Sequence, residues 1–203
     1  MSNDDDGADL AGLVLALIGT RQSVAPKRLH APGPDAGQLQ RMVQAAACAP
    51  DHRGLKPWRL IRVADDQRDA LADLFETCSR ERLPPPEPDD LAKSRAKAYR
   101  APTLLLAVLR TEPPDPEVPY TERAVALGAA LMALLLAAHG LGFGAMLTSG
   151  RAVRTARFAR AFALGEGEQA VCFVSIGTAE GQRPKPRGSA HEYLSDWQLP
   201  ADT

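Results

Sequence analysis

The chain has 203 residues, enough for one sizeable domain and too few for two of ordinary size. Hydrophobic residues make up 45% of it and charged residues 24%, a composition that excludes a disordered or fibrous protein. The formal net charge of −1 provides no overall field to attract nucleic acid or anionic lipid. Any anion that the protein binds must therefore meet a local cluster of donors.

Cysteine content and the N-terminal sequence indicate the cellular compartment. Cys48, Cys78 and Cys172 are too few and too widely spaced for a disulfide framework or a CxxC metal pair, which predicts structural thiols in a reducing compartment. The N-terminal sequence MSNDDDGADL is acidic where a signal peptide is basic, and we expect residues 1–8 to be disordered. The longest apolar run, residues 124–138, is shorter than the roughly 18–20 residues that span a bilayer. We therefore expect a cytoplasmic protein.

In the first part of the chain, hydrophobic periodicity predicts two helices and a strand. Apolar positions at helical spacing predict a helix over residues 10–18, followed by an irregular basic connection over 19–29. Asp35 is placed to cap a second helix, which Pro50 ends. The alternating sequence WRLIRVA, residues 58–64, predicts a strand.

The middle of the chain alternates between helical patterns and proline-rich loops. A third helix is expected to begin at Asp65 or Asp66, and the prolines of residues 83–88 form a rigid spacer after it. A short basic helix over 89–99 leads to TLLLAVL, residues 103–109, whose unbroken apolar run predicts a strand buried on both faces.

The last part of the chain begins with the apolar run at 124–138, which has no polar face and is expected to be a core or interface helix. A strand over 143–148, a helix over 151–163 and a strand over 170–177 should follow it. The polar tail, residues 179–203, carries isolated aromatic residues and is expected to pack on a partner subunit.

About six helices and four strands without regular βαβ alternation predict an α+β fold, in which helices flank a central mixed or antiparallel sheet. The whole chain, residues 1–203, is expected to be a single domain.

Several catalytic motifs can be rejected. GLGFGA, residues 140–145, matches a dinucleotide fingerprint, but its glycines follow a helix and precede a strand, which is the reverse of the required order. Neither Ser149 nor Ser175 lies in a G-x-S-x-G motif, and the four histidines lack metal-ligand spacing. An arginine stripe at positions 151, 154, 157 and 160 could touch nucleic-acid phosphates, but without interleaved aromatic residues a solvated helix face is the better interpretation.

Positive charge also gathers in three irregular segments, residues 20–23, 94–102 and 182–187. Arg and Lys bind phosphate through charge-assisted hydrogen bonds, so the three segments together could hold one phosphate and the polar edge of a ring. On composition alone, three solvated basic loops are an equally good interpretation.

The order of these segments resembles that of the nitroreductase family of flavin enzymes. The resemblance rests on an Arg-x-Ser after the first helix, the loop PDHRGLKPW entering a strand, a G-x-G-x-x-x-x-S-G turn at 142–150, Ile-Gly-Thr at 176–178 and a final Lys-x-Arg. It covers about residues 10–187 and is closest to a compact subgroup with an Ala-Pro-Asp-His loop.

The resemblance implies an intertwined homodimer with two FMN sites at the interface, in which the flavin carries the chemistry and no side chain is a catalytic residue. NADH or NADPH would be the co-substrate, and nitroaromatics or quinones would be typical acceptors in a ping-pong cycle. No metal, nucleic acid or membrane is implied. The matching cofactor-binding positions are Arg21, Gln22, Ser23, Pro50, Asp51, His52, Gly54, Lys97, Leu147, Thr148, Ser149, Lys185 and Arg187.

Two positions depart from the family pattern. Gln22 stands where a second arginine is usual, and Leu147-Thr148 replaces an aromatic-basic pair. Two alternatives also remain open: a flavin oxidase or dehydrogenase with a dedicated metabolite, and a binding module that uses the arginine stripe.

Overall fold

The computed structural model describes residues 3–82, 84–181 and 186–199. Its strands are β1 (Leu29–His30), β2 (Trp58–Arg62), β3 (Thr103–Arg110), β4 (Gly144–Thr148) and β5 (Glu168–Ala179). Its α-helices are α1 (Asn3–Thr20), α2 (Ala36–Ala46), α3 (Arg68–Arg80), α4 (Pro88–Ala96), α5 (Tyr120–Gly140) and α6 (Ala156–Ala161). Among the short 3-10 turns, η1 (Pro26–Arg28), η2 (His52–Gly54), η4 (Lys97–Tyr99) and η5 (Ala152–Arg154) lie near candidate site residues.

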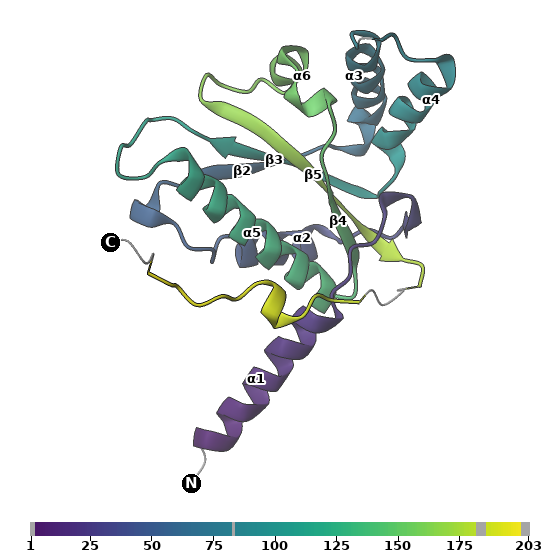
Figure 1. Ribbon diagram of the computed structural model, residues 1–203. Coiled ribbons are helices and arrows are strands. Elements are labelled where there is room, and N and C mark those ends of the chain that lie inside the picture. Colours follow the sequence, from purple (N-terminus) through teal and green to yellow (C-terminus); the bar gives the residue numbers. More distant parts are fainter. Residues whose placement is uncertain (1–2, 83, 182–185, 200–203) are drawn as a thin grey trace.

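The body has three layers, with α2 and α5 on one face of the sheet and α3, α4 and α6 on the other (Figure 1). The long strand β5 pairs antiparallel with β1, β3 and β4, and β2 extends the sheet beyond β3. This architecture confirms the predicted α+β class with an antiparallel sheet flanked by helices.

Strand β3 is buried on both faces, as its apolar run predicts. Leu105, Ala107 and Leu109 pack toward α2 and α5, where Leu134 is fully buried. The alternate residues Leu104, Leu106 and Val108 pack toward α3 and α6, against a cluster of phenylalanines comprising Phe75, Phe158 and Phe173. Because successive strand side chains point to opposite faces, one uninterrupted apolar run supplies both halves of the core.

Helix α5 is the core helix expected from the apolar run. By length and composition it could cross a membrane, but its buried residues, which include Leu127, Leu131 and Leu134, belong to the core cluster beneath the sheet. At its C-terminal end His139 Nε2 lies 2.9 Å from Thr20 Oγ1, which links α5 to the end of α1.

Three elements differ from the sequence prediction. The segment expected to be an irregular connection, residues 19–29, ends in the first residue of β1, because Leu29 is buried and pairs with Ala179, a long-range contact that local propensity does not reveal. The helix expected over 151–163 is divided into η5 and α6, since Thr155 is extended and caps α6 by accepting a hydrogen bond from the Phe158 amide. Helix α1 runs from Asn3 to Thr20 and is therefore longer than the predicted helix over residues 10–18.

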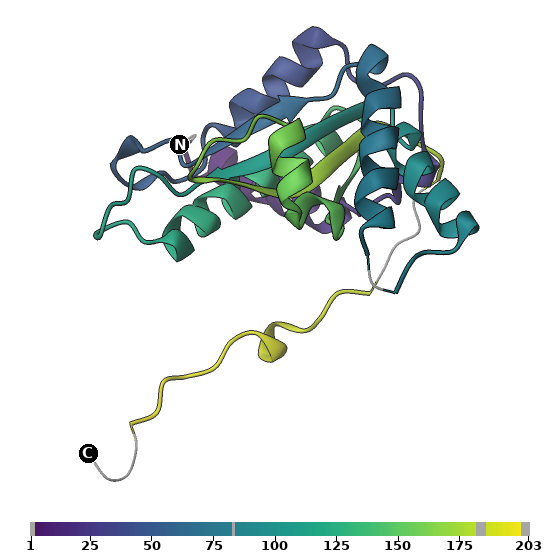
Figure 2. The same ribbon diagram turned by 90° about the horizontal axis from the view of Figure 1, so that it is seen from above.

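Two segments extend away from the body. Helix α1 projects from the lower edge in Figure 1, and residues 186–199 leave the body as an extended strap in Figure 2. Both expose large apolar side chains; on α1, Leu10 and Leu13 are each 63% exposed, and on the strap Trp197 is 84% exposed. Such exposure is typical of surfaces that a second chain covers.

An ion-pair cluster joins the edge of the sheet to the start of β5. Glu168 accepts two hydrogen bonds of 2.7 Å from Arg59 on β2, and Arg110 on β3 donates a third of 3.3 Å. The Arg59 hydrogen bonds are the main cause that lowers the pKa of Glu168, to about 2. This arrangement stabilises the ionised carboxylate in the folded state.

We predict that Glu168→Gln removes an acid-dependent part of the stability. A carboxylate with a lowered folded pKa stabilises the fold above its unfolded pKa, and this contribution disappears as the pH falls from about 5 to about 2. The wild type should therefore lose roughly 2 kcal/mol more than the variant over that range in denaturant unfolding. Equal losses in the two proteins would contradict this role for Glu168.

Candidate functional site

The candidate site begins where the chain leaves α1 and runs beside β4. Ser23 forms a parallel bridge with Ala145, and the Val24 amide donates to the Ala145 carbonyl at 3.1 Å. The segment 21–24 therefore forms an additional edge of the sheet, on the side of β4 opposite β5. This places Arg21, Gln22 and Ser23 next to the glycine-containing turn that precedes β4.

Two glycines permit this close packing. Gly142 has a positive φ of 86°, a conformation that favours glycine. A Cβ at Gly144 would lie 2.8 Å from Ala179, 2.9 Å from Leu29 and 3.0 Å from Val24. The G-x-G sequence is thus explained by backbone packing, in agreement with the rejection of a dinucleotide fingerprint.

Arg21 and Arg187 meet at this edge. The Arg187 guanidinium donates to the Arg21 carbonyl, and Arg21 Nε is buried without a hydrogen-bond partner in the described structure. Burial, and secondarily the charge of Arg187, lowers the pKa of Arg21. A buried guanidinium donor beside a second cation is suited to an anion. Lys185, the other residue of the Lys-x-Arg pair, lies outside the described residues.

A cavity of about 230 Å³ lies at the far end of β4. Thr148, Ser149 and Lys97 line it together, so the structure brings these three predicted residues to one place. Leu147 immediately precedes them on β4. The other lining residues are Pro26, Arg100, Leu104, Gly150, Phe173 and Ser175. Pro26 continues the segment that contains Arg21, so the strand-like edge runs from the basic pair to this cavity.

Lys97 is held in place by a buried arginine. Arg68 on α3 is 6% exposed and donates hydrogen bonds of 3.0 Å to the carbonyls of Ala98 and Pro102, on either side of the end of η4. Desolvation, with additional repulsion from Arg100 and Arg82, lowers the pKa of Lys97. The structure therefore fixes the backbone around an ammonium group that lies among other cations.

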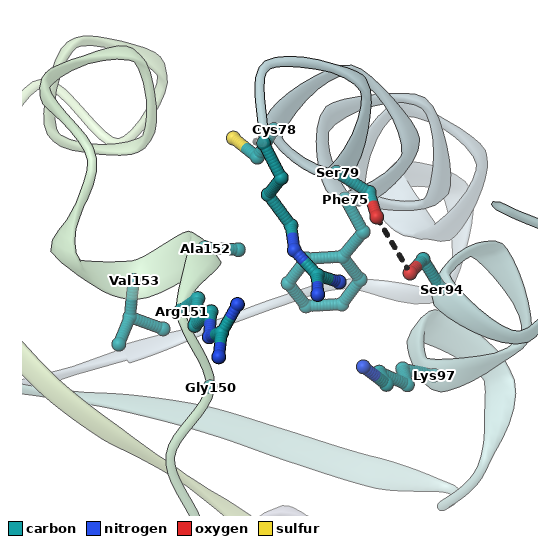
Figure 3. A pocket seen from close by; sticks show the side chains of 10 residues that line it. Phe75, Cys78, Ser79, Ser94, Lys97, Gly150, Arg151, Ala152 and Val153 are labelled. Atoms are coloured by element: carbon teal, nitrogen blue, oxygen red, sulfur yellow. Dashed lines mark hydrogen bonds between the residues drawn. The ribbon is translucent and has the colours of Figure 1, made fainter. Parts of the chain in front are cut away.

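A second cavity, of about 330 Å³, adjoins the first and shares Lys97 and Gly150 with it (Figure 3). Its walls come from α3, α4 and the turn after β4. Ser79 and Ser94 lie on its helical side, where their hydroxyl groups are 3.3 Å apart.

The loop after α2 is ordered by its own aspartate. The Asp51 carboxylate accepts hydrogen bonds from the backbone amides of Leu55 at 3.0 Å and Lys56 at 2.8 Å. His52 Nδ1 lies 2.7 Å from Glu122 Oε1 at the start of α5. Pro57 is buried and Trp58 packs against the core, so the tryptophan has a packing role where the chain enters β2.

In the single chain this loop lies apart from the other predicted residues. Pro50, Asp51 and His52 line a separate cavity of about 420 Å³ with residues of α5, and that cavity shares no residue with the one around Lys97. Gly54 follows them, with a positive φ of 63°. The predicted site residues therefore form two groups within one chain.

Sequence reasoning overlooked several residues near Lys97. Arg82 lines the larger cavity, and Pro26 lies on the wall of the smaller one. Arg100, which belongs to the basic segment 94–102 but was not singled out, lines the smaller cavity. Arg151, the member of the arginine stripe that directly follows the turn, lines the larger cavity. For Arg151, its position directly after the G-x-G-x-x-x-x-S-G turn was the sequence signal of a place near the site. Arg82 had no such signal, because α3 brings it to the cavity from a distant part of the sequence.

Within the described ranges, no group of three His, Cys, Asp or Glu side chains is placed to hold a metal ion. Cys78 and Cys172 are buried, whereas Cys48 is exposed. Burial raises the pKa of the Cys172 thiol to about 11, so this thiol stays protonated near neutrality.

The basic pair Arg21 and Arg187, together with the cavity around Lys97, is suited to binding an anionic ligand along β4.

The sequence model of the Nitroreductase family matches residues 18–178, which is most of the chain. The chain belongs to the nitroreductase family. A Haemophilus influenzae protein named "Putative NAD(P)H nitroreductase" is 34% identical over 164 residues, covering 81% of this chain and 87% of the relative. The Escherichia coli K12 protein named "Putative NAD(P)H nitroreductase YdjA" is 30% identical over 168 residues, covering 82% of this chain and 88% of the relative.

Solved structures of this family share the fold. A nitroreductase-like family protein from Bacillus cereus superposes with a TM-score of 0.76 at 19% identity, covering 91% of this chain and 96% of the other. A nitroreductase from Desulfovibrio desulfuricans, solved in complex with FMN, gives a TM-score of 0.69 at 23% identity, covering 92% of this chain and 98% of the other.

Proposed function

We propose that this nitroreductase-family protein is an FMN-dependent, NAD(P)H-dependent oxidoreductase. The observation that carries the proposal is the line of groups along β4, from the buried Nε atom of Arg21 and the neighbouring Arg187 to the cavity around Lys97. Family membership and the FMN complex of a structural relative support it.

The residues along β4 fit the parts of FMN. The unpartnered Arg21 Nε and the Arg187 guanidinium are suited to the phosphate. The stretch of β4 from Ala145 to Thr148 spans about 10 Å, a distance that the ribityl chain can follow. Lys97, Thr148 and Ser149 then offer donors to the polar edge of the ring.

When bound, FMN supplies the redox chemistry: hydride passes from NADH or NADPH to the flavin and then, in a ping-pong cycle, to an acceptor such as a nitroaromatic or a quinone. The task of the chain is to hold and orient the cofactor. Lys97 would hold its ammonium group beside the ring, and the hydrogen bonds from Arg68 to the Ala98 and Pro102 carbonyls fix the backbone that positions it.

We further propose a homodimer in the cytoplasm. Pairing of two chains would cover the apolar side chains of α1 and the strap, of which Leu15 is 69% and Tyr193 80% exposed. It would also allow Pro50, Asp51, His52 and Gly54 of one chain to complete the cavity around Lys97 of the other. The two buried thiols are compatible with a reducing compartment.

We predict that Arg21→Ala weakens FMN binding by a factor of roughly 10 to 150, because it removes a charge-assisted contact worth about 1.5–3 kcal/mol. Fluorescence titration of apoprotein with FMN measures the change. Arg160→Ala is the matched control, since Arg160 is exposed on α6, and should leave the affinity unchanged. Equal affinity of wild type and Arg21→Ala would contradict the assignment of the phosphate site.

A mixed dimer tests whether each site is built from two chains. Chains carrying Arg21→Ala and His52→Ala are coexpressed with different affinity tags, and the heterodimer is isolated. If the loop of one chain completes the site of the other, the heterodimer keeps one intact site, whereas both variant homodimers have two damaged ones. FMN bound per dimer at limiting FMN should then exceed that of both homodimers. If the heterodimer binds no more FMN per dimer than the mean of the two homodimers, each site lies within one chain.

A further inference from the structure

The charged side chains that line the cavity between α3, α4 and the turn after β4 are all positive. Three cations reach it: Arg82 from the end of α3, Lys97 from η4 and Arg151 from the turn. Figure 3 shows the Lys97 ammonium and the Arg151 guanidinium projecting into the space between the helices and the turn. Among the residues that the structure describes, no Asp or Glu lines the cavity.

These cations are left without counter-ions. Across residues 3–82, 84–181 and 186–199, no ion pair includes Arg82, Lys97 or Arg151. The neighbouring carboxylates are already engaged. Asp90 pairs with Lys93 at 3.3 Å, and Glu81 accepts a hydrogen bond of 2.6 Å from Arg157.

Desolvation is the main cause that lowers the pKa of Lys97, and repulsion from Arg100 and Arg82 lowers it further. Like charges that converge without a counter-ion attract an anion, since binding one relieves their mutual repulsion. The positive charge is therefore suited to binding, and ion pairing within the described structure does not account for it.

The floor of the same cavity is apolar. Phe75, Cys78 and Val153 are buried beneath it. A volume of about 330 Å³ is within the range of small-molecule sites. An apolar floor with a cationic rim accommodates an organic acid better than a free inorganic ion, because the organic part can bury apolar surface while the acid meets the cations.

We propose that this cavity, lined by Arg82, Lys97 and Arg151, binds the anionic group of a substrate that reacts at the adjoining ring cavity. The group is a carboxylate, sulfonate or phosphate, carried either by the electron acceptor or by the 2′-phosphate of NADPH. The inference rests on the proposed function, because Lys97 and Gly150 belong to both cavities.

Two matched pairs of substrates test the proposal. The first pair is 4-nitrobenzoate and the neutral 4-nitrobenzyl alcohol, and the second is NADPH and NADH. In the double variant Arg82→Ala/Arg151→Ala, kcat/KM for the anionic or phosphorylated member of at least one pair should fall about tenfold or more, while its counterpart changes less than twofold. The responding pair identifies the source of the anion.

Arg154→Ala/Arg160→Ala is the control for lost charge, since both residues are exposed and neither lines the cavity. In this control variant, the ratio of kcat/KM between the two members of each substrate pair should stay within twofold of the wild-type ratio. If the Ala variant does not fold, Arg82→Gln/Arg151→Gln replaces it. The proposal would be overturned if the cavity variant lowered kcat/KM equally for both members of each pair, or changed it for neither member. It would also be overturned if the control variant lost the preference for the anionic member to the same extent.

Flavin content separates this proposal from the proposed function. A protein that binds no FMN refutes the proposed function. The cavity is then judged by isothermal titration of 4-nitrobenzoate. Binding that is about tenfold weaker in Arg82→Ala/Arg151→Ala supports the anion site, and binding that is absent or unchanged in the variant overturns it.

Discussion

The pairing of β4 on both of its edges determines where the candidate ligand-binding groups lie. On one edge β4 pairs with the long strand β5, and on the other Ser23 and Val24 lie beside Ala145. This arrangement depends on Gly144, where a Cβ would collide with three neighbouring side chains. Through it, the basic pair near α1 and the cavity near Lys97 lie along a single strand.

The surrounding layers give this strand a rigid base and leave its ends polar. The sheet is buried between two helical layers, and Arg68 uses hydrogen bonds to backbone carbonyls to hold the Lys97 segment against α3. Uncompensated cations therefore persist next to a well-packed core. Such a site binds and orients an anionic cofactor and substrate, while the cofactor supplies the chemistry.

Much of the fold could be predicted from local patterns, because β3 and α5 are apolar over long unbroken runs. The two-residue strand β1 could not, since its pairing with β5 joins residues that are far apart in the sequence. The same limit applied to the site. The order of the family segments predicts Arg21, Lys97 and Ser149 as site residues, whereas Arg82 reaches its cavity only through the packing of α3 and α4 against the turn.

The most direct test of the central claim is the visible absorption spectrum of the purified protein after incubation with FMN and removal of free flavin. The account predicts oxidised-flavin bands that are bleached anaerobically by NADH or NADPH and restored by a nitroaromatic or a quinone. A protein that stays colourless would contradict the account. A bound flavin that neither nucleotide reduces would contradict the proposed NAD(P)H dependence.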